Sequence, residues 1–311
     1  MNQQSEQRST THPVTDPKTR ITHCIDWLTV TYPCDLGIQN VYPVHSAFET
    51  TGEVLSTNWR NYTRLMKFNH GKILWNPERP EQRICVEYSA RGLFDLHQAG
   101  LLAETLLAHA LECDGNITRL DFAVDYFGPS SPQELYDEAE AGRVKTRAHT
   151  YSSWKTTKLK KRGAGDDLSF YLGSNKSART LRCYDKAKKL RVSGPRTRLE
   201  LTMREGLGNR VAAAMLQAGM GPAGKSAIRD FFQCDVDWFK EAVEGESVNI
   251  PDAPYKEPKT REWLMDSVTK SLSKQVIADA AEENFEILER YCLLLEGLKA
   301  EYLQPGHPLW S

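Results

Sequence analysis

The sequence predicts an α+β protein: a mainly antiparallel central sheet with packed helices, followed by a helical C-terminal region. Three observations support this class. Several segments rich in β-branched and aromatic residues alternate apolar and polar side chains, as strands do. Between them, residues 101–113 carry apolar side chains at helical spacing. From residue 207 onward the apolar pattern becomes helical.

A polar tail over residues 1–20 precedes the first predicted strand, ITHCIDWLTVTY at 21–32. Further strands are predicted at 62–69, 72–76, 83–89, 116–127, 167–173, 179–187 and 196–204. Helices are predicted at 44–56, 101–113, from Ser131 onward, and at 207–218, 223–233, 235–244 and 257–303. A basic loop spans 143–166, and prolines mark a linker near 248–258. The domain boundaries that follow are a tail at 1–20, a sheet domain at 21–206 and a helical region at 207–311.

Composition excludes several classes of protein. The 311 residues carry a formal net charge of −1, with 40% hydrophobic and 26% charged residues, which is ordinary globular usage. No apolar run approaches the roughly 20 residues of a membrane span, and the N-terminus has no apolar signal region. Seven cysteines without a C-x-x-C motif are typical of free thiols in a reducing compartment. We therefore expect a cytoplasmic protein with no membrane partner.

The near-neutral total conceals one strongly basic region. Residues 143–204 contain 18 Lys or Arg and 4 Asp or Glu, a net charge of +14, so the remainder of the chain carries −15. Clustered positive charge favours a polyanionic partner. The alternative is a solvated basic surface balanced by acidic helices elsewhere.

Three predicted strands carry one polar side each. Arg119, Asp121 and Asp125 alternate with apolar residues in the first. In the second, Arg182, Tyr184 and Lys186 share a side, and in the third Arg198, Glu200, Thr202 and Arg204 do so. If the strands are neighbours, these sides form one surface. The alternative is an exposed sheet face with surface salt bridges.

That mixture of side chains suits phosphoryl transfer. A phenolic oxygen can attack phosphorus, carboxylates can hold Mg²⁺ or Mn²⁺, and cations offset charge on phosphoryl oxygens. Residues four apart on a strand are about 13 Å apart, so Asp121 and Asp125 cannot both ligate one ion on a straight strand. We favour Asp121 with Glu200 as partner, with Glu87 and Asp26 as alternatives.

Five motifs in order give the chain a resemblance to a known family. They are IDWLTV at 25–30, TRLDFAVD at 118–125, GSNKS at 173–177, LRCYDK at 181–186 and RLEL at 198–201. This set resembles the replication initiation factor family of rolling-circle plasmids and filamentous phages, which is related to a class of conjugative relaxases. The resemblance covers roughly residues 21–204, and none of it extends into the C-terminal third.

The resemblance implies origin-specific DNA nicking by a tyrosine with a divalent metal, Mg²⁺ or Mn²⁺. Tyr184 would attack a phosphodiester and form a 5′-phosphotyrosyl enzyme and a free 3′-OH. Asp121 and Glu200 would be metal ligands, together with Asp125, and Lys186 and Arg182 would stabilise the phosphate or assist proton transfer. The partner would be origin DNA, double-stranded with a single-stranded or hairpin nick site, with a host helicase and a second copy of the chain as further candidates.

The sequence departs from better-known nicking enzymes in two ways. Its eight histidines contain no His-x-His pair, so carboxylates would have to hold any metal. One tyrosine sits in the motif, so a relay between two tyrosines is not visible. The residues expected to contact DNA are basic: Lys155, Lys158, Lys160, Lys161, Arg162, Lys176, Arg179 and Arg198.

Residues 219–226, GMGPAGKS, fit the phosphate-loop pattern G-x-x-x-x-G-K-[ST]. The run before them is helix-forming rather than a buried strand, which predicts a connection between two helices and a chance match. Trp59, Tyr62, Phe68 and Trp75 are interpreted as core and hairpin packing, with base stacking as the alternative.

The leading hypothesis is a rolling-circle replication initiator that nicks and rejoins DNA. A conjugative relaxase would share that chemistry. Two hypotheses from other classes are a non-catalytic DNA-binding replication regulator and an RNA-binding sheet protein, the latter disfavoured because no aromatic RNA-binding strand motif is found.

Overall fold

The computed structural model describes residues 20–38, 41, 53–68, 71–79, 81–98, 102–148, 150–156, 167–174 and 176–250. The predicted tail at 1–19, the helix at 257–303 and most of the linker near 248–258 lie outside these residues, so their prediction is not tested. Within the described ranges, no helix has both the length and the apolarity needed to cross a membrane.

A ten-stranded sheet is the centre of the fold, in the order β2-β3-β4-β5-β1-β6-β11-β10-β9-β8. All of its strand pairs are antiparallel. The strands are β1 (Ile21–Tyr32), β2 (Glu53–Ser56), β3 (Arg64–Lys67), β4 (Gly71–Trp75), β5 (Ile84–Ser89), β6 (Asn116–Tyr126), β8 (Tyr151–Thr156), β9 (Asp167–Leu172), β10 (Arg179–Asp185) and β11 (Thr197–Met203). A second, two-stranded sheet joins β7 (Lys145–Thr146) to β12 (Phe232–Gln233).

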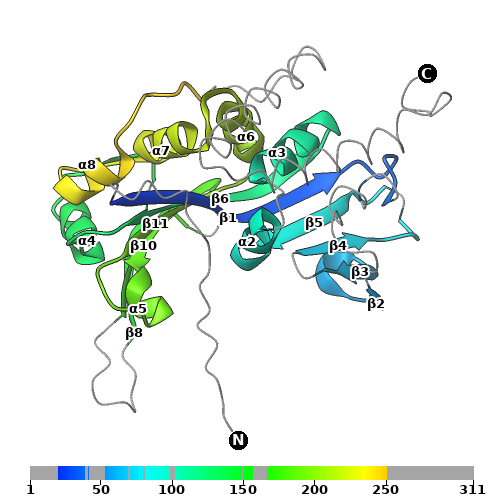
Figure 1. Cartoon of the computed structure of the whole chain (residues 1–311), viewed down its shortest axis with the longest axis horizontal. Helices are drawn as coiled ribbons and strands as arrows, with labels where there is room; N and C mark the ends of the chain where they lie inside the picture. The colour runs from blue at the N-terminus through cyan, green and yellow to red at the C-terminus, as the bar shows by residue number, and fades with distance from the viewer. Residues whose placement is uncertain are drawn as a thin grey trace, which may run out of the picture.

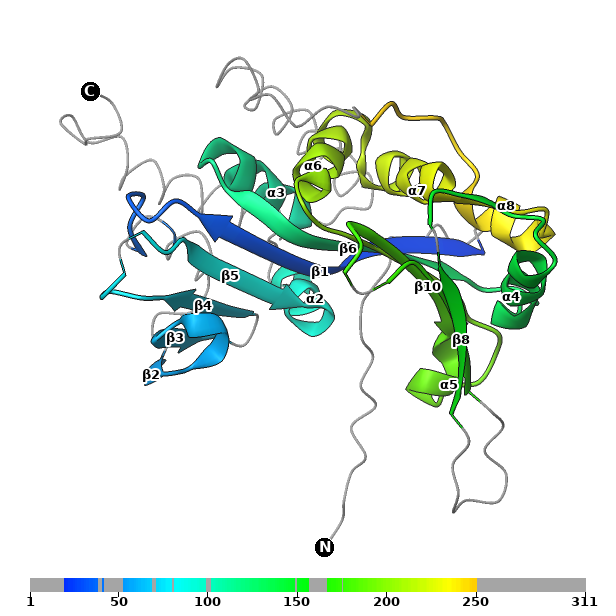
Figure 2. The ribbon, with the colours of Figure 1, turned by 180° about the vertical axis from the view of Figure 1, so that it is seen from behind.

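Helices pack along this sheet. They are α2 (Ala90–Gln98), α3 (Ala103–Glu112), α4 (Pro132–Glu140), α5 (Lys186–Leu190), α6 (Leu207–Ala218), α7 (Met220–Phe231) and α8 (Asp237–Val243), with a 3₁₀ turn, η1, at Trp59–Asn61. Figure 1 shows α3, α6, α7 and α8 in a row along β1 and β6. Figure 2 shows the molecule from behind. In this view β8 and β10 bend away from α6 and α7, and α5 lies near the end of β8 that is far from those two helices. The predicted α+β class is confirmed for the described residues.

The alternation predicted for the central strands shows which side of each strand faces the hydrophobic core. Leu120, Phe122 and Val124 of β6 are each 0% exposed. Leu199 and Leu201 of β11 belong to the same buried cluster. Alternate side chains of a strand point to opposite faces, so the polar residues between them lie on the other face of the sheet.

The glycines of the phosphate-loop-like motif let α7 pack closely on this core. A Cβ on Gly224 would lie 2.4 Å from atoms of the Phe122 ring, and one on Gly221 would lie 2.7 Å from the His23 ring. Helix α6 ends at Ala218 and the motif continues into α7, so the expected strand before a phosphate loop is absent from this position. The prediction of a helix-to-helix connection and a chance match is confirmed.

Several element predictions need correction. Residues 53–56, expected at the end of a helix, form β2 because they pair with β3 in a hairpin. The strand expected at 179–187 stops at Asp185, whose side chain accepts from the Lys188 backbone N–H and caps α5. The basic loop contains β7 and β8, and α2 was not predicted. Long-range pairing decides β2, whereas the end of β10 is decided by the local cap at Asp185.

Candidate functional site

The central strands β6, β11 and β10 present one continuous polar surface. We use "polar face" for the side of the sheet opposite the buried Leu120, Phe122 and Val124. In strand register, Asp125, Arg198 and Tyr184 lie directly opposite one another across the three strands. On the next rung toward Asp121, Ala123, Glu200 and Arg182 are opposite one another, followed by Asp121, Thr202 and Thr180. Adjacent strands are about 4.8 Å apart, so side chains that were far apart in sequence meet here.

Tyr184 lies among cations with its hydroxyl on a carboxylate. Its hydroxyl donates to Glu200 Oε2 at 3.2 Å. The Arg182 guanidinium lies 4.3 Å from the centre of its ring, and Lys189 Nζ lies 4.7 Å from it. Burial and the charge of Glu200 raise the pKa of Tyr184 above its ordinary value, and Arg198 and Arg182 oppose that rise. The side chain is 3% exposed.

Arg182 has donor capacity that the described protein does not use. Its Nε is buried and has no hydrogen-bond partner among the described residues. Its guanidinium also lies 5.4 Å from the centre of the Tyr171 ring on β9. A buried N–H left without an acceptor is costly, so this group is suited to an anionic oxygen beside Tyr184.

Lys186 was expected to continue the strand but opens helix α5. It is 4% exposed, and its Nζ lies 5.9 Å from the centre of the Tyr184 ring. Burial, followed by the charge of Arg198, lowers the pKa of Lys186 to about 8. The group therefore loses its proton only a little above neutral pH, which is the range in which a proton donor is effective.

A β-bulge brings Asp26 onto the polar face. The register of β1 against β6 shifts between Ile25, which pairs with Phe122, and Trp27, which pairs with Asp121. The extra residue, Asp26, forms an ion pair with Arg198. Bulges redirect single side chains in this way and are common beside functional sites.

Arg198 and Asp125 form a buried charged network that ties β1, β6 and β11 together. Arg198 is 0% exposed and contacts Asp125 through Nε at 2.6 Å and through a second nitrogen at 2.7 Å. Arg196 adds a contact to Asp125 Oδ2 at 2.6 Å. Burial pushes the pKa of Asp125 upward, but Arg198 and Arg196 outweigh that effect and hold it below its ordinary value.

This network contains two residues for which the sequence predicted other roles. Asp125, which was predicted as a metal ligand, has both of its oxygens in contact with nitrogens of two arginines, Arg198 and Arg196. Arg198, which was predicted to contact DNA, is fully buried between two carboxylates. Both side chains are therefore engaged by ion pairs within the protein.

Asp121 and Glu200 lie near each other, and Asp121 contacts one arginine where Asp125 contacts two. Asp121 accepts from Arg119 at 3.0 and 2.5 Å. Burial, followed by the charges of Asp26 and Asp121, raises the pKa of Glu200. Among the described residues, no group of three or more His, Cys, Asp or Glu is arranged to hold a metal ion. A pair of carboxylates that repel each other is nevertheless the donor chemistry that Mg²⁺ uses, because that ion is commonly bound by one or two carboxylates plus substrate phosphates.

The residues expected to contact DNA are dispersed. Lys176 is exposed in the turn before β10. Arg179 pairs with Asp230 of α7 and shares the core side with Met203, so it lies on the other face from Tyr184. Lys155 belongs to β8, whereas Lys158, Lys160, Lys161 and Arg162 lie outside the described residues.

Three residues of the site were missed by sequence reasoning. Lys189 was counted in the basic segment but not placed at the tyrosine, because a strand was expected where α5 begins. Arg196 lies directly before β11 but inside the strand predicted at 196–204, and its alternation with Arg198 could have indicated it. The ring centre of Trp27 lies 4.6 Å from the Arg119 guanidinium. Trp27 belongs to the motif at 25–30, and that motif could have indicated it as a site residue.

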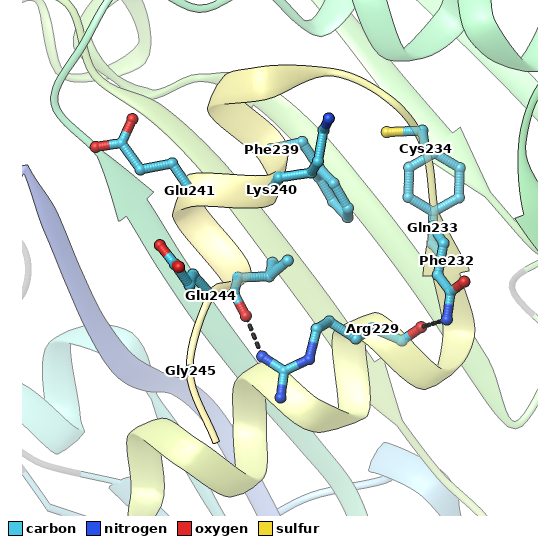
Figure 3. A pocket seen from close by; sticks show the side chains of 10 residues that line it. Arg229, Phe232, Gln233, Cys234, Phe239, Lys240, Glu241, Glu244 and Gly245 are labelled. Carbon is cyan, nitrogen blue, oxygen red and sulfur yellow. Dashed lines mark hydrogen bonds between the residues drawn. The ribbon is translucent and has the colours of Figure 1, made fainter. Parts of the chain in front are cut away.

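Two cavities lie elsewhere in the described part of the molecule. One of about 420 Å³ is bordered by the end of α7, β12 and α8 (Figure 3). There Arg229 donates to the carbonyl of Val243, and Gln233 donates to the Arg229 carbonyl at 3.1 Å. Burial raises the pKa of Cys234 in its wall to about 11, so that thiol stays protonated. The other cavity has an acidic lining that includes Glu134, Asp137 and Asp235. Neither is lined by the residues around Tyr184.

Comparisons with known proteins agree with this architecture. Residues 115–290 match the family described as replication initiation factor. A solved structure of a rolling-circle replication initiator protein from Geobacillus stearothermophilus is similar, with a TM-score of 0.60 and 18% sequence identity, covering 79% of this chain and 96% of that one. A search of curated proteins found no match. The family match spans more than half of the chain, including the three strands that build the polar face, and the chain therefore belongs to the replication initiation factor family.

Proposed function

We propose that the protein initiates rolling-circle replication by nicking and rejoining origin DNA through Tyr184. The observation that carries this proposal is the hydrogen bond from the Tyr184 hydroxyl to Glu200, beneath the guanidinium of Arg182. It supplies a nucleophile, an acceptor for its proton and a cation for phosphate in one place. Family membership and the similar solved initiator support the same reading.

In the proposed reaction the Tyr184 oxygen attacks phosphorus and its proton passes to Glu200. The bond from phosphorus to the 3′ oxygen breaks, leaving a 5′-phosphotyrosyl enzyme and a 3′-OH. Lys186 gives the leaving oxygen its proton, and Arg182 Nε donates to a non-bridging phosphate oxygen. The phosphotyrosine retains the free energy of the broken phosphodiester bond. Attack by a 3′-OH on the phosphotyrosine can therefore rejoin the strand.

Asp121 and Glu200 are the residues that would hold Mg²⁺ or Mn²⁺. A bound divalent ion would supply positive charge to the phosphate and lower the pKa of the phenol. Arg119 keeps Asp121 in place, with an Nη2-to-Oδ2 distance of 2.5 Å, and Arg198 keeps Asp26 beside Glu200. The chain's own groups therefore orient the carboxylates.

The test uses supercoiled DNA carrying the origin of the replicon that encodes the chain, with Mg²⁺ or Mn²⁺. Wild type should give nicked circles joined covalently to protein, and Tyr184→Phe should give none while DNA binding is kept. Tyr171→Phe is the matched control, because Tyr171 is a neighbouring phenol that also contacts Arg182, and it should form adduct normally. Adduct with Tyr184→Phe would exclude Tyr184 as the nucleophile.

The carboxylates are tested in the same assay. Glu200→Gln and Asp121→Asn should each slow nicking by about 10²-fold or more, the usual contribution of a positioned acid or base. The metal concentration needed for half-maximal nicking should rise for whichever variant still turns over. Normal nicking and normal metal dependence in both variants would show that neither residue serves the proposed role.

One observation favours a second candidate, a DNA-binding replication regulator that does not nick. Tyr184 is 3% exposed, covered by the side chains of α5 and Arg182. A regulator would bind the origin and give no adduct even as wild type. The cover consists of long flexible cations rather than apolar core, so a phosphate can replace it, and we therefore favour the nicking enzyme.

A further inference from the structure

A second cluster of an aromatic ring and cations lies on the sheet outside the Tyr184 site. Trp59, in the 3₁₀ turn η1, has the Arg60 guanidinium 4.1 Å and the Lys72 Nζ 4.0 Å from the centre of its ring. Lys72 also contacts Glu87 at 2.5 Å. Lys67 of β3 lies directly opposite Lys72 of β4 and is exposed, which adds a third cation to this cluster.

This cluster is on the polar face. Trp59 packs against Leu74 and Cys85, and strand alternation puts Leu74 with Lys72 and Cys85 with Glu87 on one side of the sheet. Glu87 lies directly opposite Thr29 of β1, which lies opposite Arg119 of β6. One uninterrupted face therefore carries both Trp59 and Tyr184.

A third ring and cation stand between the two ends. Arg119 lies over Trp27, and the Trp27 indole donates to Thr29 at 2.9 Å. From β5 to β10 the sheet takes four strand steps, about 19 Å at the usual strand spacing. The polar face thus presents aromatic rings paired with cations at intervals, over a length that several extended nucleotides would span.

The backbone at Trp59 is held in an unusual conformation. Arg60 and Asn61 are consecutive non-glycine residues with positive φ, 51° and 66°. The Asn61 carbonyl accepts from Asn76 Nδ2 at 3.4 Å. Side chains rarely adopt this region, and such conformations gather at ligand-binding positions. The turn holds Arg60 over the indole.

We propose that Trp59, with Arg60, Lys72 and Lys67, is a binding subsite for the single-stranded DNA that flanks the nick. A base stacks on the Trp59 indole, and the cations contact adjacent phosphates. Stacking on aromatic rings beside cations is how proteins hold single strands without reading their sequence. Duplex DNA hides its base faces, so the subsite acts after the strands separate. This inference rests on the proposed function of Tyr184 but makes a separate claim about binding.

The first test measures the affinity of the full chain for a fluorescently labelled oligothymidylate of about 20 nucleotides. Trp59→Leu should weaken binding about fivefold or more, the loss expected for one stacked base. Trp75→Leu is the matched control. Trp75, in β4, is half-buried as Trp59 is, but it packs against the main core on the other side of the sheet. Equal affinities for the two variants would overturn the proposal.

A second measurement remains valid if Trp59→Leu folds poorly. Trp59→Tyr keeps a ring and should retain most of the affinity. Subtracting its fluorescence from that of wild type isolates the Trp59 emission, which a stacked base should quench on addition of oligothymidylate. No change in that difference would overturn the proposal, and an equal effect of blunt duplex would overturn its restriction to single strands.

The cations are tested by salt dependence. Each phosphate contact to a single strand contributes a slope of about 0.7 in a plot of log affinity against log salt concentration. Lys67→Gln should lower the slope by about that amount. Arg64→Gln removes an exposed cation that lies opposite Trp75, on the other side of the same strand, and should leave the slope unchanged. Identical slopes for the two variants would contradict the phosphate contact.

These outcomes are separable from those for nicking. If Tyr184→Phe still forms adduct but Trp59→Leu loses affinity, the nucleophile is wrong and the subsite stands. If Tyr184→Phe loses adduct and Trp59→Leu binds as the Trp75 control does, the nucleophile stands and the subsite is wrong.

Discussion

Lys186 is a residue whose charge the fold brings close to the physiological range. It faces Asp26 from β1, Asp125 from β6, Arg198 from β11 and Lys189 from its own helix. Burial and the two neighbouring cations outweigh the two carboxylates and lower its pKa to about 8. A lysine at this position can therefore both hold a proton at neutral pH and release it.

The nicking rate should depend on this proton. Lys186 is charged below pH 8 and neutral above it, so a step that needs its proton should slow as the pH rises through about 8. Lys186→Arg keeps its charge at higher pH and should move this alkaline limb upward, even if the maximal rate falls. Rates from pH 6 to 10 test this, with the exposed Lys188→Arg as the control. An unchanged limb in Lys186→Arg would assign it to another group.

At the scale of elements, the register of the strands determines what the alternating polar residues contact. Alternation along β6, β10 and β11 was predictable, because the period of two is a local property. The start of α5 was not predictable. At Asp185 a helix cap competes with continuation of the strand, and the pattern TLRCYDK does not show whether the helix or the strand is more stable there. Helix α2 was missed for a similar reason, since its apolar residues Leu93 and Leu96 are few.

The Arg198 network should contribute strongly to stability because it joins three strands through buried charges. Arg198→Met removes the cation and leaves Asp125 and Asp26 without it, which should destabilise the fold by about 3–5 kcal/mol. Urea unfolding measures the change. Arg196→Gln, which loses a contact nearer the surface, should cost less. A loss below about 1 kcal/mol for Arg198→Met would contradict the structural role of the network.

The seating of α7 on β6 depends on a glycine. Gly224→Ala would place a Cβ 2.4 Å from the buried Phe122 ring, so helix or ring must shift. We expect a destabilisation of about 1–3 kcal/mol, typical of overpacking. Thermal unfolding measures it, and Phe122→Leu should relieve part of the clash in the double variant. If the two substitutions destabilise additively, the proposed contact between them is wrong.

For the whole molecule, positive charge is concentrated in one segment of the sequence, which contains β8, β9, β10 and β11 together with the predicted basic loop. Residues 143–204 carry a net charge of +14, whereas the chain as a whole carries −1. Long-range attraction for a polyanion is therefore expected from this segment, although several of its cations form internal ion pairs such as Arg198 with Asp125. The remaining cations of this segment are the ones that we expect to contact DNA.

Replacing Lys158, Lys160, Lys161 and Arg162 together by Gln tests that loop. Each phosphate contact to duplex DNA contributes about 0.9 to the salt slope, so the slope for origin DNA should fall by up to about 4. Arg143→Gln should change it little, because that guanidinium is held by Glu138 at 2.7 Å. An unaltered slope in the fourfold variant would show that the loop does not contact phosphates.

The amino-acid sequence by itself determined the α+β class, the polar side of three central strands and the tyrosine, acids and cations on it. These follow from local periodicity and from the charge pattern. Only the tertiary structure decided which of them meet: Asp26 and Arg198 are 172 residues apart in the chain. Their contact requires the bulge in β1 and the sheet order β1-β6-β11, which no local pattern specifies. For the same reason Asp125 could be recognised as a carboxylate on the polar face but not as the partner of two arginines.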